Sequence, residues 1–127
     1  MTASDAARSV ALLAAQAAAD KQAQDLVIMD VSERLVITDV FLIASATNER
    51  QVQAIVDEIE DRLRTEAAVK PVRREGTREG RWVLLDYLDV VVHVLHAEER
   101  VYYALERLWT DCPTIPFVDV AAPPSVG

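Results

Sequence analysis

The chain has little cysteine, glycine or proline: its 127 residues include 1 Cys, 3 Gly and 5 Pro. Because Cys112 is the sole cysteine, an internal disulfide and a metal site built from several cysteines are excluded. So few glycines and prolines exclude a collagen-like or linker-like chain. With 51% hydrophobic residues, the sequence instead predicts a folded domain with a core of its own.

Basic residues are also scarce, since 13 Lys and Arg stand against 21 Asp and Glu, which gives a formal charge of -8. Such a surface repels phosphate backbones and anionic lipid, so we expect no direct sequence-specific binding of nucleic acid and no membrane binding. The charge favours a cationic partner. A role in solubility alone explains the negative charge equally well, so the composition does not identify a partner.

Long apolar runs are missing too, and none approaches the roughly 20 residues that a membrane helix needs. The N-terminus lacks a basic region followed by an apolar stretch, and Asp5 occupies a position where a signal peptide carries positive charge. We therefore predict a cytoplasmic protein.

Three segments have the apolar spacing of amphipathic helices, and five short apolar runs are typical of strands. Strands buried on both faces need helices on both sides. The order predicts an α/β fold, a three-layer α-β-α domain around a mixed five-stranded sheet. The helices are predicted at residues 5–19, 48–66 and 97–109, and the strands at 26–29, 40–44, 69–72, 82–85 and 90–95.

Local signals refine this arrangement. Because Pro71 cannot donate a backbone hydrogen bond, the strand over 69–72 is predicted at an edge of the sheet. The short link over 86–89 predicts a tight hairpin between the last two strands. Residues 30–39 are interpreted as a loop with a partly buried middle. On the 48–66 helix, i,i+4 ion pairs are expected for Glu58 with Arg62 and for Glu60 with Arg64.

No catalytic constellation stands out in the sequence. His93 and His96 lie three positions apart on a strand, so they should point to opposite faces. No glycine-rich phosphate loop occurs. Aspartates near strand ends are more economically explained as caps of turns, although a metal-dependent enzyme acting on nucleotides remains the alternative. The aspartates concerned are Asp30, Asp39, Asp86 and Asp89.

The hairpin offers the materials of a protein interface. Trp82, Leu84 and Asp86 alternate to one face of its first strand, and Tyr87 and Leu88 lie at its tip. The competing interpretation is that Trp82 and Leu84 pack beneath a helix, and the sequence leaves both open.

Several linked motifs together resemble the ribosomal silencing factor family, also called Iojap-like. The likeness spans residues 6–109, and the proline-containing tail over 111–127, which we expect to be extended or flexible, lies outside it. The motifs are Asp-Leu-Val-Ile-Met-Asp-Val-Ser at 25–32, Ile-Thr-Asp-Val-Phe-Leu-Ile-Ala-Ser-Ala-Thr-Asn at 37–48, Gly-Arg-Trp-Val-Leu-Leu-Asp-Tyr-Leu-Asp-Val-Val-Val-His at 80–93 and Glu-Glu-Arg-Val-Tyr-Tyr-Ala-Leu-Glu-Arg-Leu-Trp at 98–109.

The resemblance implies a nucleotidyltransferase-like fold without catalytic residues, and therefore no enzyme, no cofactor and no metal. It implies a factor that binds the large (50S) ribosomal subunit through ribosomal protein L-fourteen, blocks joining of the small subunit and represses translation under nutrient limitation. A homodimer that uses the same surface is an alternative. The implied contact residues are Trp82, Leu84, Asp86, Tyr87, Leu88 and Asp89.

One departure from the family concerns the hairpin turn. Family members often have glycine where this chain has Leu88. Because leucine disfavours a positive φ, we expect the turn to differ in geometry here.

Overall fold

The computed structural model describes residues 2–103 and 105–120 of the chain. It contains three α-helices, five strands and one short 3-10 helix among these residues. In chain order they are α1 (Asp5–Asp20), β1 (Gln24–Asp30), β2 (Val40–Ala46), α2 (Glu49–Glu66), β3 (Arg73–Glu75), β4 (Trp82–Asp86), β5 (Val90–His96), α3 (Ala97–Tyr103) and η1 (Leu105–Trp109).

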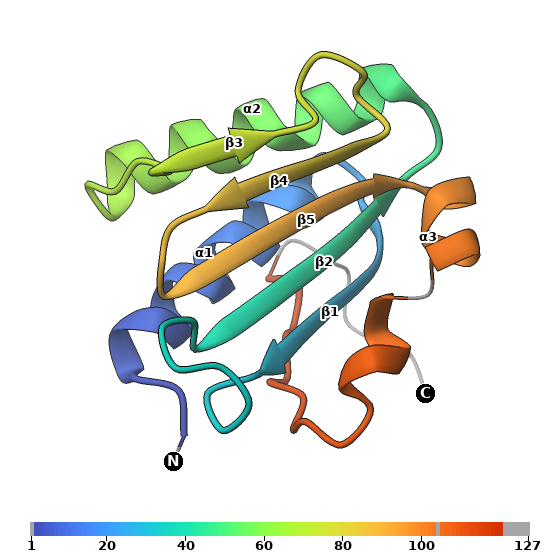
Figure 1. Ribbon diagram of the computed structural model, residues 1–127. Helices are drawn as coiled ribbons and strands as arrows, with labels where there is room; N and C mark the ends of the chain where they lie inside the picture. The colour runs from blue at the N-terminus through green and yellow to red at the C-terminus, as the bar shows by residue number, and fades with distance from the viewer. Residues whose placement is uncertain (1, 104, 121–127) are drawn as a thin grey trace, which may run out of the picture.

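The strands form one mixed sheet in the order β1-β2-β5-β4-β3 (Figure 1). The central strands β2 and β5 run parallel, and every other neighbouring pair is antiparallel. The predicted mixed five-stranded sheet is confirmed, as is the hairpin that joins β4 to β5. Both central strands are almost wholly buried, as their continuous apolar runs predict.

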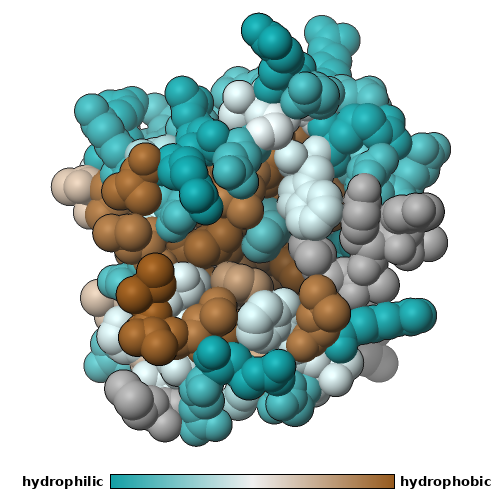
Figure 2. Space-filling view, in the orientation of Figure 1, coloured by the Kyte–Doolittle hydropathy of each residue, from teal (hydrophilic) through white to brown (hydrophobic). Residues whose placement is uncertain are grey.

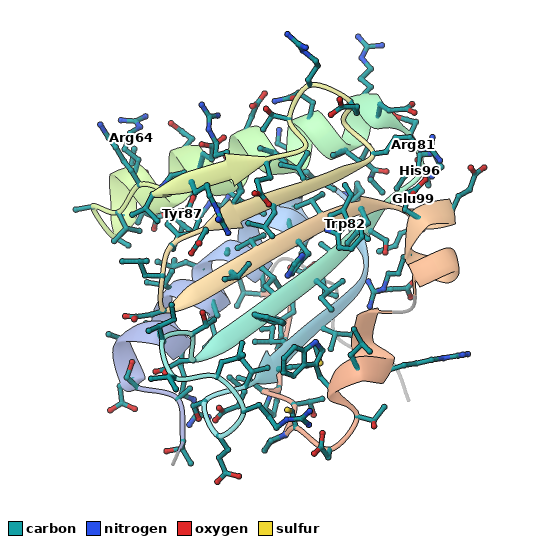
Figure 3. The ribbon with its side chains drawn as sticks, viewed as in Figure 1. Arg64, Arg81, Trp82, Tyr87, His96 and Glu99 are labelled. Carbon is teal, nitrogen blue, oxygen red and sulfur yellow. The ribbon has the colours of Figure 1, made fainter. Side chains whose placement is uncertain are left out.

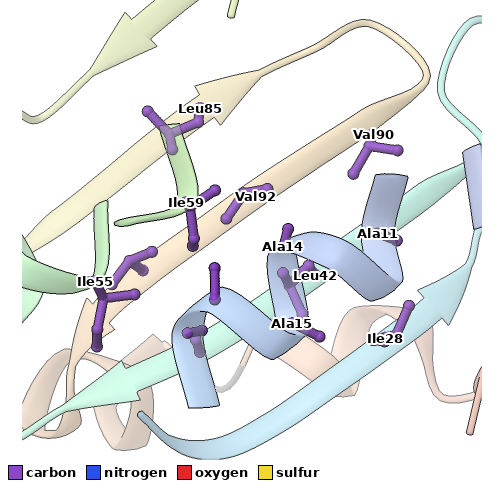
Figure 4. Close-up of a cluster of buried hydrophobic side chains, with 14 of the residues drawn as sticks. Ala11, Ala14, Ala15, Ile28, Leu42, Ile55, Ile59, Leu85, Val90 and Val92 are labelled. Atoms are coloured by element: carbon purple, nitrogen blue, oxygen red, sulfur yellow. The ribbon is translucent and has the colours of Figure 1, made fainter. Parts of the chain in front are cut away.

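Helices α1 and α2 lie side by side on one face of the sheet (Figure 1). α1 begins at the predicted Asp5 and α2 one residue after its predicted start, and before each helix the side chain of Ser4 or Asn48 accepts a hydrogen bond from a backbone N–H of the first turn. The many alanines of α1 let it approach the strands closely. Figure 4 shows Ala11, Ala14 and Ala15 beside Leu42 and Ile28 in the main core.

The opposite face of the sheet is covered only in part, by the loop before β2 and by η1 with the residues that follow it. A second apolar cluster joins four buried residues to partly buried ones that include Leu35, Trp109 and Cys112. The buried Arg100 of α3 donates hydrogen bonds to the backbone oxygen of Asp25 and to the hydroxyl of Ser45, so α3 is tied to the sheet. The four buried members of this cluster are Met29, Val31, Ile43 and Leu95.

The edge strand differs from its prediction. Residues 69–72 form no strand, and β3 instead begins at Arg73, within the segment interpreted as a polar loop. Pro71 has no N–H to donate, and pairing with β4 starts at the N–H of Val72, which donates to the oxygen of Asp86 at 2.8 Å. The resulting edge strand is charged and exposed, which protects it from pairing with other chains.

Two further expectations are corrected and one is met in part. The 30–39 loop is partly buried, at Leu35 and Thr38, but Val36 and Ile37 are 100% and 74% exposed. Arg64 pairs with Asp61 rather than with Glu60, whereas the predicted pair of Glu58 and Arg62 forms at 3.4 Å. The single helix predicted over 97–109 is divided into α3 and η1.

The chain after η1 runs along the outer edge of β1. The oxygen of Pro113 accepts from the N–H of Asp30 at 2.8 Å, and the N–H of Ile115 donates to the oxygen of Ile28 at 2.8 Å. Ile115 is only 8% exposed and belongs to the main core. The described part of the tail is therefore extended and hydrogen-bonded, and residues 121–127 lie outside the described residues. No helix in the described parts of the chain is long and apolar enough to span a membrane.

Candidate functional site

The predicted contact residues of β4 lie on the sheet face opposite α1 and α2, called here the outer face. Val83 and Leu85 point into the main core, so the alternating Trp82, Leu84 and Asp86 point the other way. In the hairpin these three stand opposite Leu95, His93 and Val91 of β5, and β2 continues the same rows with Phe41 and Ile43.

The outer face is largely apolar. Figure 2 shows hydrophobic colour gathered over the strands and continuing to the left-hand end of the sheet. Phe41, Trp82 and Leu84 each remain partly exposed at its surface. Such a surface on a small acidic protein marks a place where another molecule can bind.

A chain of ring contacts organises this face. The indole N–H of Trp82 donates to Nδ1 of His93 at 3.2 Å. Phe41 stands edge-on to His93, with ring centroids 5.2 Å apart, and edge-on to Trp109 at 5.1 Å. Trp82 is thus held by this hydrogen bond and stays partly exposed, and among the described residues Figure 3 shows no helix over it.

His93 is 7% exposed, and burial lowers its pKa to about 4. It is therefore neutral near pH 7, in agreement with the hydrogen bond that Nδ1 accepts from Trp82. Its Nε2 atom has no hydrogen-bond partner among the described residues. His93 is therefore a buried histidine with only one of its two ring nitrogens hydrogen-bonded among the described residues.

The β4–β5 turn keeps a glycine-like backbone despite its leucine. Leu88 has a φ of 71°, and its N–H donates to the carboxylate of Asp86 at 2.8 Å. The N–H of Tyr87 closes the turn onto the oxygen of Val90 at 2.9 Å. The expected change of turn geometry is therefore wrong, because these hydrogen bonds hold leucine in the left-handed region, and its side chain is left 51% exposed.

Tyr87 points away from the other predicted contact residues. Figure 3 shows its ring between β4 and α2, where it packs against the main core. Burial and the nearby carboxylate of Glu60 raise the pKa of Tyr87 well above its usual value, with Arg74 opposing the shift. The structure therefore brings Trp82, Leu84 and Asp86 together on one face but places Tyr87 behind them.

Asp30 and Asp39, two of the aspartates considered for an enzyme, accept hydrogen bonds from backbone N–H groups. Asp30 accepts from the N–H of Ala3 at 2.9 Å and from the N–H and hydroxyl of Ser32. Burial raises the pKa of Asp30, but these hydrogen bonds outweigh it and hold the pKa below its usual value. Asp39 likewise accepts from the N–H of Ser4 at 2.9 Å. No three His, Cys, Asp or Glu side chains of the described residues are arranged to hold a metal ion.

At the other end of β4 lies an ion-pair cluster with a structural role. The guanidinium of Arg81 contacts Glu49 at 3.0 Å, Glu98 at 3.1 Å and Glu99 at 2.9 Å. It thereby ties the start of β4 to the first turns of α2 and α3 (Figure 3). His96 is occupied nearby, since its Nδ1 accepts from the N–H of Glu98.

Sequence reasoning missed Phe41 on the outer face and the exposure of two apolar residues in the loop before β2. Phe41 belongs to the outer face, and its alternation with Ile43 on β2 was the available signal. Val36 and Ile37 were placed in a half-buried loop, and only the structure shows them exposed.

Comparison with known proteins identifies the relatives of this chain. Its sequence matches the family described as "Ribosomal silencing factor during starvation" over residues 4–126. The chain belongs to the ribosomal silencing factor family. The Iojap-like resemblance seen in the motifs is thereby confirmed, and the matched range also includes most of the tail.

Members of the ribosomal silencing factor family from several bacteria are similar to the chain over most of its length. This chain is 44% identical over 106 residues to ribosomal silencing factor RsfS of Bacillus subtilis, and the match covers 84% of this chain and 89% of that protein. The chloroplastic protein Iojap of Zea mays is 31% identical over 107 residues, which cover 84% of this chain and 46% of that protein.

Solved structures agree with the fold. A crystal structure from Bacillus halodurans superposes with a TM-score of 0.75 at 40% identity, covering 87% of this chain and 99% of that one. One from Chromobacterium violaceum gives a TM-score of 0.77 at 34% identity and covers 91% and 93% of the two chains.

Proposed function

We propose that this ribosomal silencing factor binds the large ribosomal subunit through ribosomal protein L-fourteen and blocks joining of the small subunit by occupying its place. Repression of translation under nutrient limitation follows from that block. The observation that carries the proposal is the apolar outer face on a member of this family.

The mechanism needs affinity and position, and no reaction. A partly exposed tryptophan fixed by a hydrogen bond loses little side-chain freedom on binding, which suits an energetic anchor. Leu84, on the same face of β4, and Leu88, in the turn at the far end of this strand, add apolar area that excludes water. The carboxylates of Asp86 and Asp89 give the rim a negative charge that favours a basic protein.

Within the proposed contact set, Tyr87 acts from behind the surface. Its ring packs beneath the β4–β5 turn and supports the backbone from which Leu88 and Asp89 project. The remaining contacts are proposed for Trp82, Leu84, Asp86, Leu88 and Asp89. A homodimer formed through this face would compete with ribosome binding.

Cosedimentation with purified large subunits tests the proposal. Trp82→Ala should lower the affinity for large subunits by about 2 kcal/mol or more, because it removes the proposed anchor. Leu12→Ala, on the far side of the molecule at α1 and 38% exposed, should bind like the parent protein. Trp82→Phe keeps the apolar ring and should lie between the two.

Circular dichroism and thermal melting of the same variants separate lost binding from lost folding. A folded Trp82→Ala protein that still sediments fully with large subunits would remove Trp82 from the interface. A parent protein that fails to sediment with large subunits at all would contradict the proposed function itself.

A further inference from the structure

Two neighbouring aliphatic side chains project into solvent from the connection between β1 and β2. Val36 is 100% exposed and Ile37 is 74% exposed. Single exposed apolar residues are ordinary on protein surfaces, but adjacent ones beside an apolar face form a patch that favours association. The outer face described above does not include them.

The connection that carries these side chains is held firmly at both ends. The N–H of Val31 donates to the oxygen of Asp39 at 2.8 Å, and the N–H of Leu35 donates to the oxygen of Val31 at 2.9 Å. Thr38 is buried, and the carboxylate of Asp39 accepts from the N–H of Ser4. Val36 and Ile37 are therefore displayed by a braced loop, which lowers the entropy cost of binding.

Backbone hydrogen bonds place this loop against the β4–β5 turn. The oxygen of Asp89 accepts from the N–H of Asp39 at 2.8 Å and from the N–H of Val40 at 3.0 Å. Leu88, 51% exposed, precedes Asp89. Both connections lie at the same end of the sheet (Figure 1), and hydrophobic colour extends to this end in Figure 2. We call Val36, Ile37 and Leu88 the apolar tip.

We propose that the apolar tip is a second part of the docking surface. It packs against an aliphatic side chain, flanked by Lys or Arg, on the same ribosomal protein that contacts the outer face. This inference rests on the proposed function and extends it to the loop between β1 and β2, which was not among the implied contact residues. The tip is continuous with the outer face through the β4–β5 turn, so one partner can cover both.

Charge decides the chemistry of that partner. Glu33 and Asp89 lie in the two connections that carry the tip. The nearby arginines are already paired, since Arg34 binds Asp111 at 2.6 Å and Arg73 lies 3.6 Å from Asp86. A negative rim around apolar side chains favours a basic protein surface and disfavours the phosphates of RNA.

The double substitution Val36→Ser with Ile37→Ser tests the tip by cosedimentation with purified large subunits. We expect the affinity to fall by at least about tenfold, because the loss of two exposed side chains removes apolar contact area without opening the core. Val118→Ser with Val120→Ser is the matched control, since these valines are 80% and 84% exposed on the tail. The control should bind like the parent protein.

The outcomes separate the two proposals. If the tip variant binds normally while Trp82→Ala binds weakly, the inference about the tip is wrong and the proposed function stands. If the parent protein does not bind large subunits, the proposed function fails. If the tip variant changes only the oligomeric state in light scattering and not subunit binding, the tip serves a second copy of this chain, and the inference is overturned.

Photo-crosslinking identifies the class of partner. A benzophenone amino acid placed at Ile37 should give an adduct with a basic ribosomal protein when the chain is bound to purified large subunits. The same amino acid at Val118 should give none. Adducts formed only with ribosomal RNA would overturn the assignment of a protein partner.

Discussion

At the scale of single residues, His93 links the outer face to pH. Burial lowers its pKa from the ordinary value of about 6.5 to about 4, and Trp82 donates to its Nδ1. At pH values between these two pKa values, His93 is protonated in the unfolded chain but neutral in the folded chain. The contribution of His93 to stability is therefore present above pH of about 6.5 and is lost as the pH falls toward about 4.

We predict that the free energy of unfolding falls by about 2 kcal/mol between about pH 7.5 and about pH 5 through this residue. Urea denaturation at a series of pH values measures it. His93→Gln, which keeps an acceptor for Trp82 and does not titrate, should remove most of this dependence. His96→Gln should retain it, and equal curves for the parent protein and His93→Gln would rule out His93 as the cause.

At the scale of elements, the β4–β5 turn holds the exposed Leu88 in a strained backbone conformation. Leu88 has a φ of 71°, a region that costs a non-glycine residue about 1 kcal/mol. Hydrogen bonds from the N–H groups of Tyr87 and Leu88 hold it there. The turn thus keeps an exposed leucine where glycine would be more stable, which is consistent with a role in binding.

We predict that Leu88→Gly raises the free energy of unfolding by about 1 kcal/mol, because glycine adopts this φ without strain. The same substitution should weaken binding to large subunits, because it removes part of the apolar tip. Thermal or urea denaturation and cosedimentation measure the two effects. Leu88→Ala is the control: it should weaken binding without the gain in stability, and an equal gain for alanine would argue against backbone strain.

The last elements of the chain depend on contacts from elsewhere. Trp109 of η1 packs edge-on against Phe41, and Arg34 lies over its ring at 5.4 Å. Arg34 also binds Asp111 beyond the helix. These contacts fold the end of the chain over one part of the outer face and leave the part near β4 accessible.

At the scale of the whole molecule, the proposed action is steric. A domain of 14.1 kDa seated on the joining surface of one subunit excludes the other subunit without any chemical step. Such a block acts only while that surface is free, so its effect depends on when the protein is added.

We predict that the protein slows subunit joining when it is incubated with purified large subunits before small subunits are added. The same amount added to joined ribosomes should have little immediate effect, because the docking surface is already covered. Light scattering of the subunit mixture measures both. Trp82→Ala should lose the inhibition, and inhibition that is independent of the order of addition would argue against a steric block.

Much of this architecture could be predicted from local patterns. The period of apolar residues in α1 and α2 and the continuous apolar runs of β2 and β5 correctly indicated their type and position. The alternation of Trp82, Leu84 and Asp86 on one face was also correct, because side chains alternate along any strand. Because the periodicity of side chains along a helix or strand is a local property, it can be recognised in the sequence.

The sequence by itself determined most of the elements, the acidic charge and the family of this protein, since each depends on residue type and order alone. Only the tertiary structure decided that Val36 and Ile37 are exposed, that Tyr87 faces the helices and that β3 starts at Arg73. It also decided that Leu88 adopts a positive φ. These features depend on contacts between segments that are distant in the sequence, such as the contact of the loop before β2 with the β4–β5 turn. The spacing of residues along the chain does not reveal such contacts.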